Sequence, residues 1–310
     1  MTTKLEPPKI KRRSKYITSL PLLLLCLPVI LYLLVFNYAP MFGVVVAFQD
    51  FSYRDGFASE WVGLENFKFF FESSDAWVII RNTVGYHVWF HVLSTVCGIF
   101  LAILFFEVLN KKALKYFQTV TALPSILSWV IIAYIVYGVL SYENGVANAA
   151  LIKMGASPIE WYNEAGYWPV ILSIVSVWQG VGMGCLVYYA AFMGVDSALF
   201  EAAELDGAGR LRQIWHIMIP SIMPIISIMA IMSVGGLLSG NLGLFYQVPM
   251  DSAALYPTTD IITTYTLRGL QNGSMGVTAA VGLFQSVTGA ILLLVTNGVV
   301  RKISPESAMF

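Results

Sequence analysis

Few residues in this chain could do covalent or metal chemistry, and most of them stand inside apolar sequence. His87 and His91 are four residues apart, so one face of a helix would present both, as a two-ligand metal site does. No third ligand has a suitable spacing, so we interpret the pair as hydrogen-bonding groups between helices, and His216 as structural. The three cysteines lack CxxC spacing and are typical of small buried hydrophobes: Cys26, Cys97 and Cys185.

Signatures of nucleotide hydrolysis and of nucleophilic catalysis are missing from the sequence. The segment Gly180-Val-Gly182-Met-Gly184 lies in an apolar run and lacks the Lys-Ser/Thr pair of a phosphate-binding loop. Small residues at this spacing favour close helix packing instead. No Ser/His/Asp or Cys/His arrangement stands out. We therefore expect a non-catalytic chain that needs no cofactor, with any ATP bound and hydrolysed by separate subunits.

The elements that must carry these residues are six long apolar runs. The 310 residues are 57% apolar or aromatic and 12% charged, against about 45–50% and about 25% in an ordinary soluble domain. A bilayer core needs about 20 apolar residues as helix. Six runs free of Asp, Glu, Lys and Arg meet this requirement: Ile17–Phe36, Thr83–Phe106, Val120–Leu140, Tyr167–Met193, Ile217–Leu238 and Val277–Val300. The prediction is an all-α integral membrane protein with six transmembrane helices.

The distribution of charge gives the orientation of these helices. With the N-terminus inside, the inner segments carry thirteen basic residues and the outer segments carry five, which predicts cytoplasmic N and C termini. The formal net charge is zero, so no basic field would attract nucleic acid. The predicted organisation is a cytoplasmic tail (1–16), a first helix with a structured, aromatic outer cap (17–80), a five-helix domain (81–305) and a second tail (306–310).

The segment 196–220, between the fourth and fifth runs, is the one predicted cytoplasmic loop with an informative pattern. Ser197 can cap a helix whose first turns contain Glu201. Asp206-Gly207 then breaks that helix with a turn-type dipeptide. A second short amphipathic helix is expected over 208–217, followed by Pro220, which starts or kinks the next span. The loop is thus predicted to be helix–turn–helix, with a charged tip around Asp206 and Arg210.

This loop resembles the EAA loop of permease subunits of bacterial ABC importers. The string E-A-A-x-x-D-G-A, then eight residues, then I-x-I-P matches eight of nine spaced positions of the family pattern; Ile219 stands where the family has leucine. The resemblance covers roughly residues 80–305, the binding-protein-dependent (MetI-like) transport domain. Softer similarities to the polysaccharide and lipoprotein-linked oligosaccharide permeases lie in 37–51, 61–67, 264–270, 279–287 and 301–304.

The resemblance implies a mechanism and a set of partners. In such importers an extracytoplasmic binding (lipo)protein delivers the substrate, two permease subunits form the pathway, and two ATPase subunits dock on the EAA loops. It implies a type I importer subunit in a bacterial cytoplasmic membrane, paired with a second, different permease and surrounded by membrane lipid. The residues it assigns to coupling with the ATPase are Glu201, Ala202, Ala203, Asp206, Gly207, Ala208, Arg210 and Pro220.

An oligosaccharide is the expected substrate, because sugars bind aromatic faces and amide groups. The residues favoured for the pathway are Trp178, Gln179, Tyr188, Asn241, Tyr246 and Gln285. The aromatic ones can equally be lipid-facing or packing residues, whereas amides in hydrocarbon need partners. Because the runs contain no charged side chains, a neutral or weakly charged sugar suits them. A permease for another solute, such as a peptide or an amino acid, is the alternative; a proton-coupled transporter would need intramembrane acids.

Overall fold

The computed structural model describes residues 15–303, which fold into helices and one short β-ribbon. The elements of the first half are α1 (Lys15–Leu33), β1 (Gln49–Asp50), β2 (Glu60–Trp61), α2 (Glu65–Glu72), α3 (Ser74–Glu107), α4 (Lys111–Ala122), α5 (Trp129–Leu140) and α6 (Val146–Lys153). Those of the second half are α7 (Trp168–Phe192), α8 (Ser197–Leu205), α9 (Arg210–Gln213), α10 (Ile219–Val234), α11 (Tyr256–Thr259), α12 (Ile262–Gln271) and α13 (Met275–Ile303). The predicted tail 306–310 and most of the tail 1–16 lie outside the described residues.

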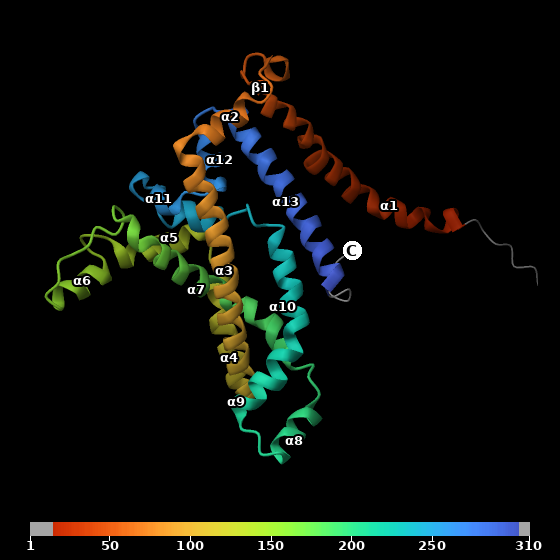
Figure 1. The fold of residues 1–310 in the computed structure, drawn as a ribbon, viewed down its shortest axis with the longest axis vertical. Helices are drawn as coiled ribbons and strands as arrows, with labels where there is room; N and C mark the ends of the chain where they lie inside the picture. Colours follow the sequence, from red (N-terminus) through yellow and green to blue (C-terminus); the bar gives the residue numbers. More distant parts are fainter. Residues whose placement is uncertain (1–14, 304–310) are drawn as a thin grey trace, which may run out of the picture.

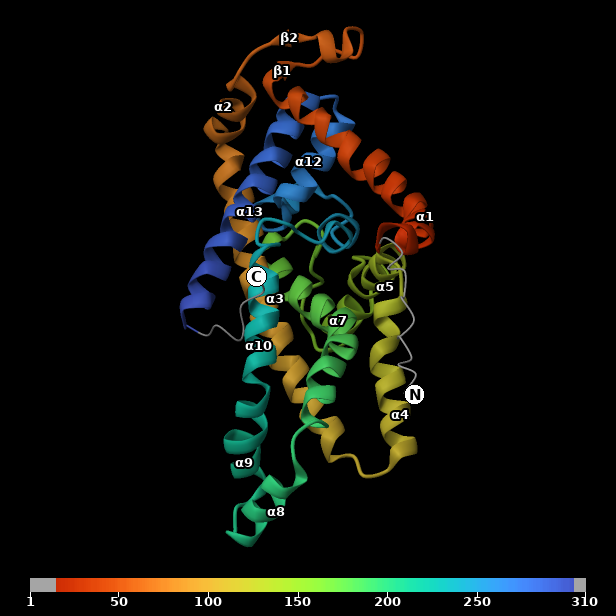
Figure 2. The same ribbon diagram turned by 90° about the vertical axis from the view of Figure 1, so that its right-hand side faces the viewer.

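The predicted membrane spans are present as helices. Five described helical stretches are long and apolar enough to cross a bilayer: Leu24–Phe48, Ser74–Glu107, Ala165–Phe192, Arg210–Val234 and Met275–Gly298. A sixth candidate is the bent pair α4 and α5. The long helices α3, α7 and α10 run alongside one another, whereas α1 slants away from them (Figure 1). The ribbon β1–β2 and the helix α8 lie at opposite ends of the molecule (Figure 2).

The third apolar run is not one straight helix. Its α4 half begins at Lys111, inside the segment expected to be a loop, because Asn110 caps it by accepting from the backbone N–H groups of Lys112 and Ala113 at 2.9 and 3.3 Å. The chain then bends by 97° before α5. Pro124 cannot donate to the helical ladder, and Ser128, in an extended conformation, caps the new helix.

The first span is longer than its predicted end at Phe36. A π-helical turn (Leu34–Tyr38) and a 3₁₀ segment (Ala39–Phe48) continue it past Pro40. Because proline lacks an N–H group, the change of helical register accommodates it without ending the helix. The apolar residues 41–48 therefore belong to the span and not to the cap.

The expected cap is ordered and is built from the ribbon and α2. β1 pairs antiparallel with β2, with Gln49 opposite Trp61. Phe48 stacks on Trp61 with ring centroids 5.5 Å apart. The Asn66 amide donates to the carbonyls of Ala47 and Gln49, both at 3.0 Å, and so ties α2 to the end of the first span.

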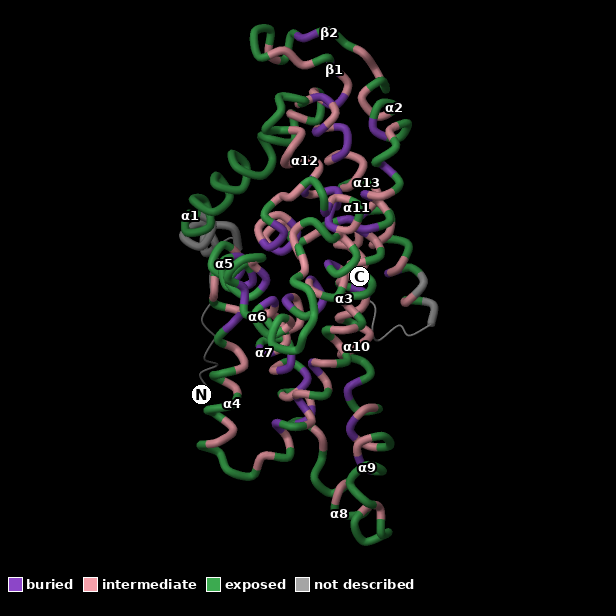
Figure 3. Tube along the Cα trace, turned by 90° about the vertical axis from the view of Figure 1, so that its left-hand side faces the viewer, coloured by how far each residue is buried: buried purple, intermediate pink, exposed green. Residues whose placement is uncertain are grey.

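Burial is concentrated where α3, α7 and α10 meet and around the segment before α12 (Figure 3). One apolar cluster joins α5, α7 and residues 244–261; a second joins α3, α7 and α10 near α8; a third joins α2, α3, α12 and α13. Gly182 permits the crossing of α7 and α4, since a Cβ there would overlap the backbone carbonyl of Thr121. Gly180 and Gly184 face open space in the described chain.

The three glycines give a test of this packing. Gly182→Ala must push α7 away from a rigid backbone carbonyl, so we expect the purified protein to lose about 1–3 kcal/mol of stability, the usual range for overpacking. Gly180→Ala and Gly184→Ala, one on each side, should leave the melting temperature in detergent unchanged. Equal melting temperatures for all three variants would contradict the close contact between Gly182 of α7 and the Thr121 carbonyl of α4.

Candidate functional site

The loop 196–220 forms the end of the molecule opposite the ribbon, and its first half is the helix α8 (Figures 1 and 2). The helix is capped one residue earlier than predicted. Asp196, not Ser197, has the extended conformation of a capping residue, and its carboxylate accepts from the N–H of Ala198 at 3.0 Å. An anionic cap also interacts favourably with the N-terminal end of the helix dipole.

Gly207 ends α8 in the left-handed conformation, with φ of +75°. The N–H of Ala208 donates to the Ala203 carbonyl at 2.8 Å, and that of Gly207 donates to the Glu204 carbonyl at 3.0 Å. This is the Schellman pattern, in which glycine relieves the clash that a Cβ makes at positive φ. The predicted Asp-Gly turn is therefore a C-terminal helix cap.

The second half of the loop is not a separate helix. The predicted amphipathic helix over 208–217 is the start of the fifth span, because α9, a π-helical turn (Ile214–Met218) and α10 form one helical stretch from Arg210 to Val234. Pro220 lies just after the π-helical turn, and this change of helical register accommodates its missing N–H without ending the helix. The imidazole Nδ1 of His216 lies 3.1 Å from the Arg212 carbonyl in this stretch.

Arg210 joins the loop to α3. Its Nε lies 2.6 Å from the Glu107 carboxylate at the C-terminal end of α3, and its Nη1 donates to the Gln213 amide oxygen at 2.6 Å. The guanidinium also lies about 6 Å from the ring centroids of Phe106 and Phe200. The pair is partly exposed, so it adds little to stability; it fixes the position of the loop.

The side chains of α8 divide into two sets. Phe200 and Ala203 are half-buried, and Phe200 packs against Phe106. Glu201, Ala202 and Asp206 are exposed, and Leu205 is 90% exposed. These exposed residues form the side of α8 that faces away from its own chain.

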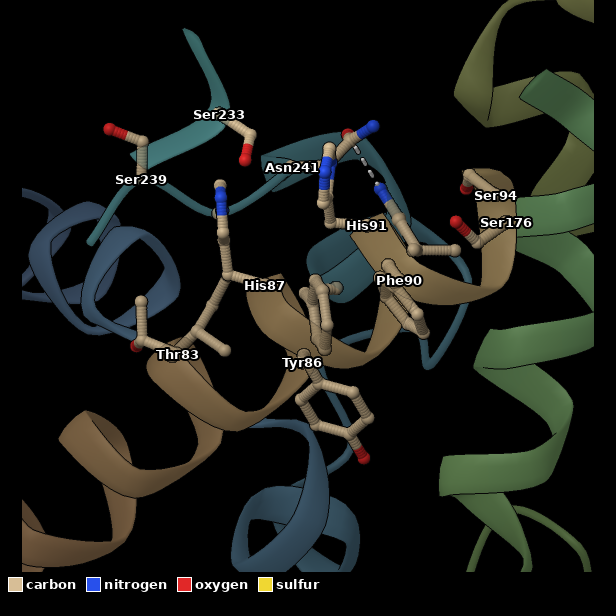
Figure 4. Close-up of a pocket in the computed structure, with 14 residues that line it drawn as sticks. Thr83, Tyr86, His87, Phe90, His91, Ser94, Ser176, Ser233, Ser239 and Asn241 are labelled. Carbon is tan, nitrogen blue, oxygen red and sulfur yellow. Dashed lines mark hydrogen bonds between the residues drawn. The ribbon is translucent and has the colours of Figure 1, made fainter. Parts of the chain in front are cut away.

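A second feature is a cavity of about 310 Å³ between α3, α7 and the segment after α10. Figure 4 shows polar side chains from all three elements around it. Tyr86 and Phe90 add aromatic faces. The hydroxyl and amide side chains in its wall are Thr83, Ser94, Ser176, Ser233, Ser239 and Asn241. A mixed aromatic and polar wall of this size suits a small polar ligand.

The wall after α10 is irregular backbone, held by side chains. The N–H of Gly240 donates to the Thr263 hydroxyl at 3.2 Å, and the N–H of Leu244 donates to the Asn241 side-chain oxygen at 3.1 Å. Irregular backbone is tolerated at membrane depth where it is buried in protein or lines a cavity. A Cβ at Gly240 would overlap the side chain of Ile261, so glycine allows this wall to approach residue 261.

The six residues favoured for the pathway are dispersed. Asn241 lines the cavity, and the Gln285 amide donates to the cavity residue Ser239 at 3.0 Å. The Tyr246 hydroxyl accepts from Gln271 at 3.5 Å. The other three lie on α7: Tyr188 in the apolar core, Trp178 beside an apolar hollow facing α5, and Gln179 half-buried.

Sequence reasoning did not assign the hydroxyl residues of the cavity to the pathway. It interpreted His87 and His91 as hydrogen-bonding groups between helices, whereas both line the cavity and the His87 Nε2 atom has no hydrogen-bond partner among the described residues. Thr83, His87, His91 and Ser94 follow one another at intervals of four, four and three, which places them on one face of α3. This spacing was the available signal. Among the described residues no group of three or more His, Cys, Asp or Glu side chains could hold a metal ion.

A charged cluster joins α12 to the segment before it. The guanidinium of Arg268 donates to the carboxylates of Asp251 and Asp260 at 3.1 and 2.5 Å and stacks 4.1 Å from the ring centroid of Tyr256. Burial alone would lower the pKa of Arg268, but the two carboxylates raise it above its usual range. The charge of Arg268 is thus compensated locally.

The comparisons with known proteins define the class. Residues 94–305 match the family described as binding-protein-dependent transport system inner membrane component. The chain belongs to this family: it is a non-catalytic, multi-pass inner-membrane permease subunit of a bacterial ABC importer.

Particular relatives are similar along almost the whole chain. Protein LplB of Bacillus subtilis (strain 168) is 34% identical, over 92% of this chain and 90% of its own. The polygalacturonan/rhamnogalacturonan transport system permease YteP of the same strain is also 34% identical, over 94% and 91%. The crystal structure of a bacterial ABC transporter that imports the acidic polysaccharide alginate contains a chain with a TM-score of 0.82 at 30% identity, covering 93% of this chain and 97% of that one.

Gly207 gives a test of the loop geometry. Gly207→Ala places a Cβ at positive φ, and we expect it to cost about 1–2 kcal/mol locally and to speed amide hydrogen exchange in residues 197–208. Gly209→Ala is the matched control, because Gly209 has an extended backbone and no atom near the position of an added Cβ. If amide hydrogens in residues 197–208 exchange at the parent's rate in both variants, the Gly207 cap does not stabilise α8.

Proposed function

We propose that this permease passes an oligosaccharide, delivered by an extracytoplasmic binding protein, through the cavity on α3. The observation that carries this proposal is the cavity itself, since its hydroxyl, amide and aromatic groups match the groups by which sugars are bound. Relatives named for oligosaccharide or polysaccharide transport support it; besides YteP they include the arabinooligosaccharide permease AraP of Bacillus subtilis (strain 168), which is 25% identical.

We also propose that α8 is the docking element for the ATPase subunits. Its exposed set, which includes Glu201, Ala202, Leu205 and Asp206, would enter a groove of the ATPase. Phe200, Ala203, Ala208 and Arg210 would hold the helix to its own chain. Of the coupling residues that the EAA resemblance implies, Glu201, Ala202 and Asp206 would thus contact the ATPase. Ala203, Ala208 and Arg210 would hold the loop to its own chain. The basic residues of α4 and of the loop lie at the α8 end (Figure 2), which supports a cytoplasmic location for it.

A second permease subunit completes the proposed assembly. Residues 24–42 of the first span are exposed in this chain, and α1 stands apart from the other long helices (Figure 1). Such a helix is available to a neighbouring subunit as well as to lipid. A solved alginate transporter complexed with a pentasaccharide-bound periplasmic protein, in which one chain is 29% identical to this one with a TM-score of 0.84, supports a binding protein on the opposite side.

The substrate proposal is tested with the reconstituted importer, which contains this chain, its permease partner, the ATPase and the binding protein. We expect an oligosaccharide mixture to stimulate ATP hydrolysis and to accumulate in vesicles, whereas di- and tripeptides and amino acids do neither. Asn241→Ala should lower uptake without lowering basal ATP hydrolysis, because it removes an amide from the cavity wall. Stimulation by peptides alone would overturn the proposal.

The docking proposal is tested with two leucines that have similar exposure. Leu205→Glu places a charge on the proposed docking surface, and we expect ATPase recovered with the purified permease to fall by about tenfold, the effect of losing an apolar contact and burying an unpaired charge. Leu109→Glu is the control: Leu109 is 95% exposed in the turn between α3 and α4. Equal recovery with both variants would exclude α8 as the docking element.

A further inference from the structure

The cavity contains a histidine pair for which the proposed sugar pathway gives no specific role. His87 and His91 both line it, and Figure 4 shows their imidazole rings projecting from α3 toward the segment that carries Ser233, Ser239 and Asn241. The His87 Nε2 atom is buried and has no hydrogen-bond partner among the described residues. A buried nitrogen without a partner is costly unless a ligand or water completes it.

No other cavity residue can carry a positive charge at neutral pH. The α3, α7 and post-α10 walls contribute hydroxyls, Asn241 and apolar groups, and the one other titratable lining residue, Tyr86, donates its hydroxyl to the Thr258 carbonyl at 2.7 Å. Two charged residues that stand close to lining residues in the sequence have partners elsewhere. Arg81 bonds the Asn82 side chain and the Pro257 carbonyl, and Asp260 is bound to Arg268.

We propose that His87 and His91 recognise the carboxylate of an acidic oligosaccharide, such as one built from uronic acids, as it crosses the cavity. This inference rests on the proposed function and narrows its substrate class. It differs from the sequence-based expectation of a neutral or weakly charged sugar, which followed from the absence of Lys, Arg, Asp and Glu in the spans. An imidazolium is the one cation that this wall can supply.

The physical argument concerns the carboxylate as it leaves water. A carboxylate entering a low-dielectric cavity loses hydration and needs a donor with opposite charge. A charge-assisted hydrogen bond is roughly twice as strong as a neutral one. In this cavity wall the groups that can supply it are the two imidazoles. Both rings line the same cavity, so either of them can donate to the carboxylate.

A solved relative gives independent support for a charged substrate. The alginate importer, similar over nearly the whole chain, is described as importing an acidic polysaccharide. The role of the histidines follows from the cavity wall and the unpartnered His87 nitrogen.

The experiment compares two tetrasaccharide probes in the reconstituted complex: tetragalacturonate and its neutral methyl ester. With wild-type protein we expect uptake of tetragalacturonate, divided by basal ATP hydrolysis, to exceed uptake of the methyl ester. The double variant H87N/H91N should lower tetragalacturonate uptake by about tenfold and leave uptake of the methyl ester unchanged. H87N/H91R should restore tetragalacturonate uptake, because arginine stays charged.

The outcomes separate this inference from the proposed function. If H87N/H91N lowers uptake of both probes equally, the histidines bind hydroxyls and the inference fails. It also fails if the double variant carries tetragalacturonate like wild type, or if wild type carries only neutral oligosaccharides; in the last case the oligosaccharide proposal stands. If no oligosaccharide stimulates the complex, both fail. Equal yields of assembled complex for all variants show that a loss of uptake is not a loss of folding.

Discussion

The structure depends on one constraint: within hydrocarbon, every backbone N–H and C=O group needs a partner inside the protein. Helices meet this need by themselves, and most of the described chain is helical. The chain departs from regular α-helix in several apolar stretches, and three of them lie at 34–48, 127–128 and 235–241. The first keeps bonding through π and 3₁₀ turns, the second through the Ser128 cap, and the third through Thr263 and Asn241. The third departure forms one wall of the cavity.

The helix α3 connects the two parts of the candidate site. Its C-terminal residue Glu107 holds Arg210 of the loop, and one of its faces presents His87 and His91 to the cavity. About 24 Å of helix separates His91 from Glu107. Phe105 and the neighbouring turns of α3 pack on α7 and α10 in one apolar cluster, so α3 is held against the two helices that flank the loop. A displacement of α8 would therefore reach the cavity through packed helices.

The order of the elements along the chain could be predicted because its causes are local. Long apolar runs specify spans, and Asp-Gly specifies the end of α8. Where prediction was incomplete, two local signals competed. Asp196 and Ser197 can both cap a helix, and only the backbone conformation selects Asp196. The bend at 127–128 has Pro124 as its sequence signal, but proline does not end every span in which it occurs. Pro169 lies in the first turn of α7, and Pro224 lies inside α10.

The sequence by itself determined that this chain spans a membrane, that it carries an EAA-type loop, and that it belongs with importer permeases, because hydrophobicity, helix caps and spaced motifs act over a few residues. The tertiary structure decided which polar residues share a cavity and which ion pair joins the loop to α3. Those relations join Thr83 to residue 262, Arg210 to Glu107 and Gln285 to Ser239, across large distances in the chain. No local pattern encodes such pairs, since each depends on how separate helices cross and where a helix gives way to irregular backbone.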